Sequence, residues 1–209
     1  MAYHIYTTEG IILKALPFGE ANVLLYILTK DLGLIVASAQ SSRLLKSKLR
    51  HGLQEYAHIT ASLVKGRNGW KLTDVSEKGS FFFDLPKPYT QCMVQVFFVL
   101  LKTIIGEMPQ PAIFETVRTG SEFLAKTFAN ANVRPTEAEL RIRENDIKNF
   151  EILLVLRILY ELGYVAQSEN TETFLASLNL WNSDLLQKIS AKKQPLVQII
   201  NKALKESQL

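Results

Sequence analysis

The hydrophobic pattern changes period near residue 85, and this change constrains the fold more than any other feature of the chain. Before it, short apolar segments rich in β-branched and aromatic residues alternate with turn signals, a pattern typical of strands. After it, apolar residues recur every three or four positions, as in helices packed on a core. Pro86 and Pro88 mark the boundary, since proline fits neither a strand interior nor a continuing helix. The sequence therefore predicts two domains, residues 1–80 and 85–209.

Five strands are predicted in the first domain. They cover residues 3–16, 23–29, 34–39, 56–64 and 70–75. Gly10 is expected to bend or bulge the first strand, which ends at the turn Pro17 to Glu20. Asn68-Gly69 is a strong hairpin signal between the fourth and fifth strands. Five short antiparallel strands in about 75 residues suit a small closed barrel.

The second domain is predicted to be all helical. Two apolar stripes step by three and four residues: Phe114, Val117, Ser121, Leu124 and Phe128, then Ile147, Phe150, Leu154, Ile158 and Leu162. Prolines 109, 111 and 135 separate helices, Gly163 stands where a left-handed cap is expected, and Pro195 can open a last helix. The predicted fold class is α+β, with an antiparallel barrel followed by a helical domain.

Positive charge is concentrated in the predicted barrel. The net charge is +4, and residues 1–80 hold ten Lys and Arg against six Asp and Glu, a surplus of 10 − 6 = 4. Residues 81–209 hold fourteen of each and sum to zero. This asymmetry indicates an amino-terminal module that meets a polyanion and a neutral remainder with another role.

The segment Gln40–Gly52 carries the clearest functional signal. It joins the third and fourth predicted strands and contains basic residues but no acidic one. The predicted nucleic-acid contacts are Arg43, Lys46, Lys48 and Arg50, extended across the neighbouring hairpin by Lys65, Arg67 and Lys71. Lys and Arg on a loop provide the mobile positive charge that phosphates require. The alternative is a solvated loop whose charges only aid solubility.

Aromatic residues in the barrel could stack on bases. The candidates are Phe18, Tyr26, Tyr56 and Trp70. The alternative is that they fill the barrel core, as aromatic residues on strands commonly do. The four-residue motif Gly66 to Gly69 matches the loop that clamps RNA in KH modules, but that loop joins helices and this one joins strands, so a hairpin is the better interpretation.

Signals for catalysis and metal binding are poor, and we predict neither an enzyme nor a cofactor. His4, His51 and His58 lie far in sequence from any carboxylate partner, and His58 alternates with strand residues as an exposed side chain would. The single cysteine, Cys92, excludes an internal disulfide and a multi-cysteine zinc site, and is expected to be buried. No nucleophile, P-loop or zinc-protease motif occurs.

No membrane segment or secretory signal is predicted. The longest apolar stretch, residues 93–101, is interrupted by Gln95 and falls short of the ~18 residues of a spanning helix. The first ten residues lack a basic region followed by an apolar block. A cytoplasmic location is therefore expected.

The amino-terminal third resembles the RecO family of bacterial recombination mediators. The matching elements are Gly19-Glu20, Gly33, the basic segment Arg43–Arg50 and Leu53-Gln54. A second, shorter match is Phe150-Glu151 followed by Glu161 to Tyr164. The resemblance implies an OB-fold followed by a helical domain, and a nucleoid-associated protein that binds single- and double-stranded DNA and anneals complementary strands. It also implies that the protein acts with RecR to load recombinase on DNA coated by single-strand-binding protein.

The resemblance departs from the family pattern at one place. Many family members carry a four-cysteine zinc module just after the position of Tyr164, whereas this chain continues VAQSENTETF. Zinc is therefore not expected.

Two other functions remain open from the sequence. The helical domain could be chiefly an adaptor that docks the acidic, apolar-ended tail of single-strand-binding protein, with Arg141, Arg143 or Arg157 holding the terminal carboxylate. An ordinary exposed helix position is the alternative for Arg157. The barrel could also bind RNA, and would then prefer folded RNA to single-stranded DNA.

Overall fold

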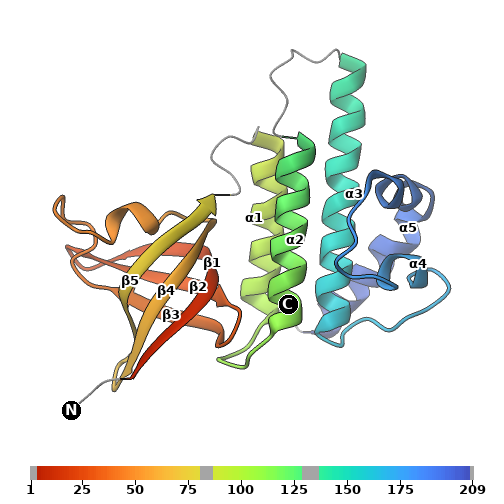
Figure 1. Cartoon of the computed structure of the whole chain (residues 1–209). Coiled ribbons are helices and arrows are strands. Elements are labelled where there is room, and N and C mark those ends of the chain that lie inside the picture. The colour runs from red at the N-terminus through yellow and green to blue at the C-terminus, as the bar shows by residue number, and fades with distance from the viewer. Residues whose placement is uncertain (1–3, 81–86, 129–136, 208–209) are drawn as a thin grey trace. The chain divides into compact units, whose positions relative to one another are not determined.

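The computed structural model describes residues 4–80, 87–128 and 137–207, and places five strands before the helices (Figure 1). The strands are β1 (Ile5–Phe18), β2 (Asn22–Thr29), β3 (Gly33–Ala39), β4 (Ala57–Gly66) and β5 (Gly69–Ser80). A 3-10 turn, η1 (Arg50–Gly52), lies between β3 and β4. The helices are α1 (Lys87–Thr103), α2 (Pro111–Phe128), α3 (Glu137–Glu161), α4 (Glu172–Leu175) and α5 (Ser183–Glu206). The α+β class is confirmed.

The strands form a closed barrel in the order β1-β2-β3-β5-β4. All neighbours are antiparallel except β3 and β5, which run parallel over Ala37–Ala39 and Trp70–Leu72. The prediction of a wholly antiparallel barrel is therefore wrong at this one pair. The reason is arithmetic, because a closed ring of five strands cannot alternate direction at every step.

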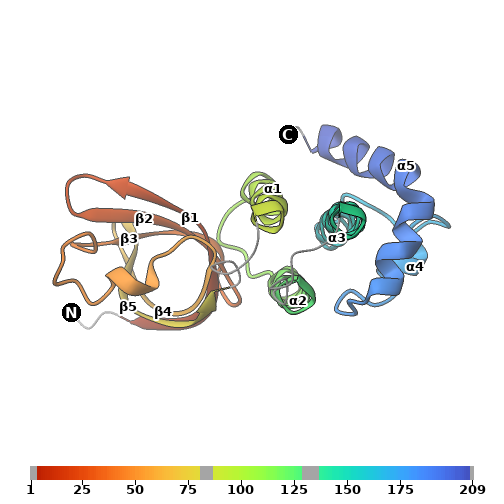
Figure 2. The same ribbon diagram turned by 90° about the horizontal axis from the view of Figure 1, so that it is seen from above.

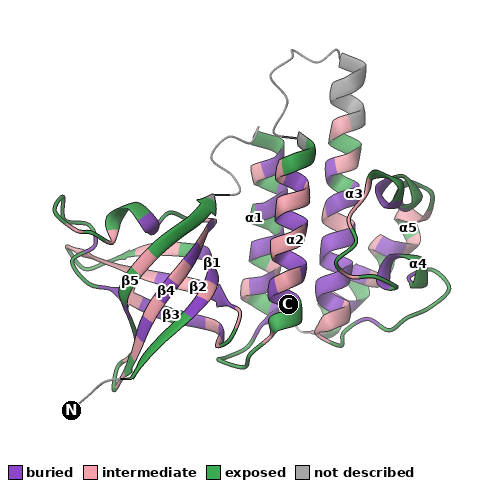
Figure 3. Ribbon diagram, viewed as in Figure 1, coloured by how far each residue is buried: buried purple, intermediate pink, exposed green. Residues whose placement is uncertain are grey.

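The barrel interior is filled by alternate strand residues, which Figure 3 shows in purple. Its core includes Ile12, Leu25, Ile27, Ile35, Ala37, Ile59, Ala61, Leu63 and Leu72. The predicted bulge at Gly10 is wrong, since the register of β1 shifts between Ile12 and Lys14. Gly10 is needed for close packing instead, because a Cβ there would lie 2.6 Å from Cγ2 of Ile27.

The predicted hairpin joins β4 and β5, one residue earlier than its sequence signal suggests. Gly66 pairs with Gly69, so Arg67 and Asn68 form the turn. Gly69 follows it with a φ of 96°, a left-handed conformation that glycine adopts without a Cβ penalty. This geometry confirms that the Gly66–Gly69 motif is a turn between strands and not a clamp between helices.

Residues 105–114, which follow α1 and include the first turn of α2, belong to the compact unit of the barrel. Gly33, the first residue of β3, allows the backbone of this segment to approach the barrel closely. Its φ is 74°, and a Cβ there would lie 2.2 Å from the carbonyl oxygen of Met108. The backbone of Met108 therefore packs directly against the backbone of Gly33. The sequence boundary near residue 85 did not anticipate this segment.

The remaining helices form a second compact unit, in which α3 packs against α1, α4 and α5 (Figure 2). The described residues of both predicted apolar stripes are buried, except Leu162 just after the end of α3, which is half-buried. Gly163 ends α3 with a φ of 80°, and the amide of Tyr164 donates to the carbonyl oxygen of Leu159, so the predicted cap is confirmed. The helix α5 is kinked at Lys192, just before Pro195. Among the described residues, no helix is long and apolar enough to cross a membrane.

Candidate nucleic-acid interface

The basic segment between β3 and β4 begins on the turn between β1 and β2. Ser41, in a left-handed conformation, donates its backbone amide to Oδ1 of Asn22 at 2.8 Å. The amide of Arg43 donates to the carbonyl oxygen of Ala21 at 2.9 Å. The buried Ser42 hydroxyl donates to the carbonyl oxygen of Ala39. These bonds fix where the segment leaves the barrel.

The far end of the segment is also anchored. A Cβ on Gly52 would lie 2.9 Å from the Val75 side chain, so the turn η1 packs directly against β5. Leu53 enters the barrel core, and the amide of Tyr56 donates to the carbonyl oxygen of Ile12 at 2.7 Å. Residues 43–50 therefore form a loop whose two ends are both anchored to the barrel.

Six of the seven predicted contact residues are exposed cations without an acidic partner among the described residues. We call these six the basic strip: Arg43, Lys46, Lys48, Arg50, Arg67 and Lys71. Arg43 donates a side-chain hydrogen bond from Nη1 to the carbonyl oxygen of Gly19 at 3.3 Å, which leaves its charge unpaired with any described carboxylate. An unpaired surface cation keeps its charge available to a phosphate.

Lys65 differs from the other predicted residues because an acidic side chain engages it. Its Nζ lies 2.5 Å from Oε2 of Glu107 and 5.1 Å from the centre of the Trp70 ring. The hydrogen bond from Lys65 lowers the pKa of Glu107. Glu107 comes from the segment 105–114, forty-two residues away, and no local sequence signal indicates this pairing.

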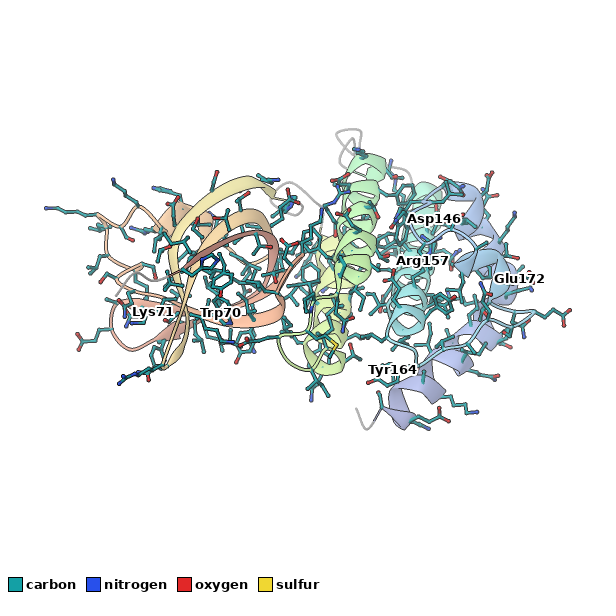
Figure 4. The ribbon with its side chains drawn as sticks, turned by 60° about the horizontal axis from the view of Figure 1, so that its bottom comes forward. Trp70, Lys71, Asp146, Arg157, Tyr164 and Glu172 are labelled. Carbon is teal, nitrogen blue, oxygen red and sulfur yellow. The ribbon has the colours of Figure 1, made fainter. Side chains whose placement is uncertain are left out.

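Arg67 and Lys71 of the basic strip lie on the β4–β5 hairpin, whereas the segment 43–50 starts at the β1–β2 turn and ends beside Val75 of β5. Arg67 occupies the hairpin tip, and Lys71 pairs in register with Ser38, two residues before the basic segment begins at Gln40. Because β3 pairs with β5 over only three positions, Val75 of β5 is left free to pack against Gly52 at the end of the segment. Figure 4 labels Trp70 and Lys71 at the start of this strand.

A groove of about 710 Å³ lies at the hairpin end of the basic strip. Its lining consists of Val64, Lys65, Gly66, Arg67, Asn68, Lys71 and Thr73. Asp74 and Glu77 are exposed farther along β5, so positive charge dominates at the groove and in the segment 43–50 but not along the whole strand. The strip therefore has two basic ends.

The aromatic candidates divide between core and surface. Trp70 is only 5% exposed and belongs to the barrel core, so it cannot stack on a base in this fold. Its neighbours on β5 explain this, since buried Trp70 and Leu72 alternate with exposed Lys71. Tyr26 and Tyr56 are half-buried, whereas Phe18 is exposed at the end of β1.

Arg157 is not the exposed helix residue predicted from the sequence. It is 1% exposed and donates to the backbone carbonyl oxygens of Phe174, Ser177, Leu178 and Leu180. Four of its five N–H donors bond to these carbonyl oxygens and the side chain is buried, so it is not available to hold the carboxylate of a bound tail. Arg143 is half-buried, and the side chain of Arg141 lies outside the described residues.

Two further titratable groups that the sequence singles out are Cys92 and His58. Cys92 is buried, and burial raises the pKa of its thiol well above the ordinary value, so the thiolate is disfavoured. His58 is half-buried, with Nε2 3.8 Å from a Glu9 carboxylate oxygen, and not exposed as predicted. The described residues contain no group of three or more His, Cys, Asp or Glu that could hold a metal.

Residues 1–81 match the family model described as the amino-terminal domain of recombination protein O. The match covers the closed barrel and the whole basic strip. The match indicates that the barrel is an OB-fold and that the chain has a role in DNA recombination and repair.

Proposed function

We propose that this chain, which belongs to the RecO family through its amino-terminal domain, is a non-enzymatic mediator that binds single- and double-stranded DNA and anneals complementary strands. The observation that carries the proposal is the basic strip, six exposed cations on an OB-fold barrel that pair with no acidic residue in the described part of the chain. Family membership supports two partners, RecR and single-strand-binding protein, with which the chain would help to load recombinase on coated DNA.

Annealing needs no covalent chemistry on this surface. Two complementary strands repel each other through their phosphates, and cations that contact one backbone reduce this repulsion. The basic strip offers such cations at both of its ends, at the hairpin groove and in the segment 43–50. We propose that these contacts hold one strand while the other pairs with it.

The affinity for single-stranded DNA is expected to fall steeply with salt. If about four to six phosphates are neutralised, log K should fall against log salt with a slope of roughly −3 to −5. Fluorescence anisotropy of a labelled oligonucleotide, measured from low to moderate salt, gives this slope. A slope shallower than about −1 would contradict phosphate binding by the strip. A preference for folded RNA in the same assay would favour the RNA-binding alternative.

Replacing Glu107 with glutamine is expected to increase DNA affinity. The change removes the charge that engages Lys65 beside the hairpin groove, which frees one more cation for phosphate. One extra contact should raise affinity by roughly two- to five-fold at about 0.1 M salt. The matched control is Glu169→Gln, which removes an exposed carboxylate of the helical unit that pairs with no cation among the described residues. Equal effects of both variants would show that only net charge matters.

A second candidate function rests on an apolar groove of the helical unit. The groove is about 270 Å³ in volume and is lined by Phe98, Val99, Lys102 and Leu204. Phe98 is exposed, and the Lys102 ammonium lies 5.7 Å from the centre of its ring. Lys102 has no acidic partner among the described residues, so an apolar pocket stands next to a free cation. This chemistry suits the acidic, apolar-ended tail of single-strand-binding protein.

Lys102→Glu should weaken binding of that tail by about ten-fold or more, because a charge-assisted contact becomes a repulsion. The measurement is a titration of the labelled tail peptide onto the full chain. Lys188→Glu is the control, since Lys188 is an exposed lysine of α5 that does not line the groove. Unchanged affinity of the Lys102 variant would exclude this groove as the docking site.

A further inference from the structure

Three large apolar side chains are exposed where the basic segment meets the turn between β1 and β2. Phe18 is 57% exposed, Leu44 is 53% exposed and Leu45 is 87% exposed. None of them belongs to the barrel core. Scattered exposed apolar residues need no explanation, but these three belong to neighbouring parts of one surface.

Hydrogen bonds hold the two segments together. The amide and the guanidinium of Arg43 donate to the carbonyl oxygens of Ala21 and Gly19, the residues that follow Phe18. The amide of Leu44 then closes a tight turn by donating to the carbonyl oxygen of Ser41. Figures 1 and 2 show the segment beside the β1–β2 turn in both views. The apolar side chains are therefore presented from an anchored backbone.

Cations surround these apolar side chains in sequence. Arg43 comes immediately before Leu44, and Lys46 comes immediately after Leu45. Neither cation has an acidic partner among the described residues. A ligand that is complementary to this surface must present negative charges next to apolar groups. A nucleic-acid strand with unpaired bases has both, because its phosphates are negative and its base faces are exposed. In a duplex the base faces are already stacked and hidden, so only phosphates remain available.

We propose that Phe18, Leu44 and Leu45 form a contact site for unpaired nucleobases, with Phe18 stacking on one base and the leucines packing against its neighbours. The inference rests on the proposed DNA binding and adds to it the discrimination of single strands from duplex. Aromatic rings stack on bases of any sequence, and apolar side chains insert between base steps in other DNA-binding proteins. The basic strip would supply the phosphate contacts common to both DNA forms.

The test compares the wild-type chain with a Phe18→Ala, Leu44→Ala, Leu45→Ala variant on single-stranded and duplex DNA across a salt series. We expect single-strand affinity to fall by roughly ten-fold while the salt slope stays unchanged, because stacking releases no counterions. Duplex affinity should change by less than about two-fold. Leu180→Ala is the control, since Leu180 is an apolar side chain of the helical unit that is 53% exposed, like Leu44.

A second arm identifies the bases themselves. An oligonucleotide with consecutive abasic sites should bind the wild-type chain roughly ten-fold more weakly than the intact oligonucleotide, and the triple variant should bind both equally. A triple variant that binds intact single strands like the wild-type chain overturns the inference and leaves the proposed function standing. Failure of the wild-type chain to bind either DNA form overturns the proposed function itself. Loss of self-association without loss of DNA affinity would assign the surface to a second copy and also overturn the inference.

Discussion

Arg157→Ala is expected to lower the free energy of unfolding of the helical unit by about 3–5 kcal/mol. The guanidinium donates to the carbonyl oxygen of Phe174 at 3.1 Å and to that of Leu178 at 2.8 Å. It also donates to the carbonyl oxygens of Ser177 and Leu180, each at 3.0 Å. Removing the side chain leaves these acceptors without their donor, and unpaired buried polar groups are costly.

The same side chain packs against Trp181, with the guanidinium carbon 4.3 Å from the centre of the ring. Burial lowers the pKa of Arg157 to about 10, so the group still carries its charge at neutral pH. The alanine variant would therefore lose a cation–π contact as well as four hydrogen bonds. Figure 4 labels Arg157 on α3, from which it reaches the loop between α4 and α5.

The two tryptophans allow this prediction to be measured in the full chain. Trp70 belongs to the barrel and Trp181 to the helical unit, so a Trp70→Phe background leaves a single reporter beside Arg157. Urea unfolding followed by fluorescence then gives the stability of the helical unit. Arg118→Ala is the control, because Arg118 forms helix-surface ion pairs with Glu115 and Glu122 and should cost less than about 1 kcal/mol. Equal losses for both variants would contradict the role given to Arg157.

Reversing the four charges of the segment 43–50 is expected to reduce single-strand affinity by about 10²–10³-fold at about 0.1 M salt. The variant carries Glu at Arg43, Lys46, Lys48 and Arg50, which are exposed and lack acidic partners among the described residues. Losing about four phosphate contacts should also make the salt slope shallower by roughly 3. Anisotropy across a salt series measures both quantities, and circular dichroism checks that the barrel remains folded.

A control with the same total charge separates the segment from the net charge of the protein. Replacing Lys126, Lys188, Lys202 and Lys205 with Glu changes four exposed lysines of the helical unit. Each quadruple variant changes the net charge from +4 to 4 − 8 = −4. The control should keep affinity within about ten-fold and keep its salt slope. Equal loss in both variants would reject the segment as a DNA contact.

Much of the barrel could be predicted from local pattern. Strand alternation located all five strands to within a few residues, apart from the longer β5, and Asn68-Gly69 located the hairpin. These features depend on neighbours in sequence, since side chains alternate at every residue and a tight turn needs glycine in a particular conformation. The bulge in β1 was misplaced, because the clash that requires Gly10 involves Ile27 on another strand.

The candidate interface was only partly predictable. The basic residues were visible because no acidic residue interrupts the segment 40–52. The pairing of Lys65 with Glu107 was not visible, since it depends on residues 105–114 folding back onto the barrel. The exposure of Leu44 and Leu45 was equally hidden, because two leucines in a row look the same in sequence whether they enter a core or leave it.

The sequence by itself determined the two-part architecture and the location of the positive charge, because the hydrophobic period and the charge are local properties that can be read from neighbouring residues. Only the tertiary structure decided which of these groups remain available to a partner. It buried Trp70 in the barrel, engaged Lys65 with Glu107 and enclosed Arg157 among four carbonyl oxygens. Whether a side chain can contact a partner depends on which residues, distant in sequence, pack against it in the fold. Local sequence patterns do not indicate these long-range contacts.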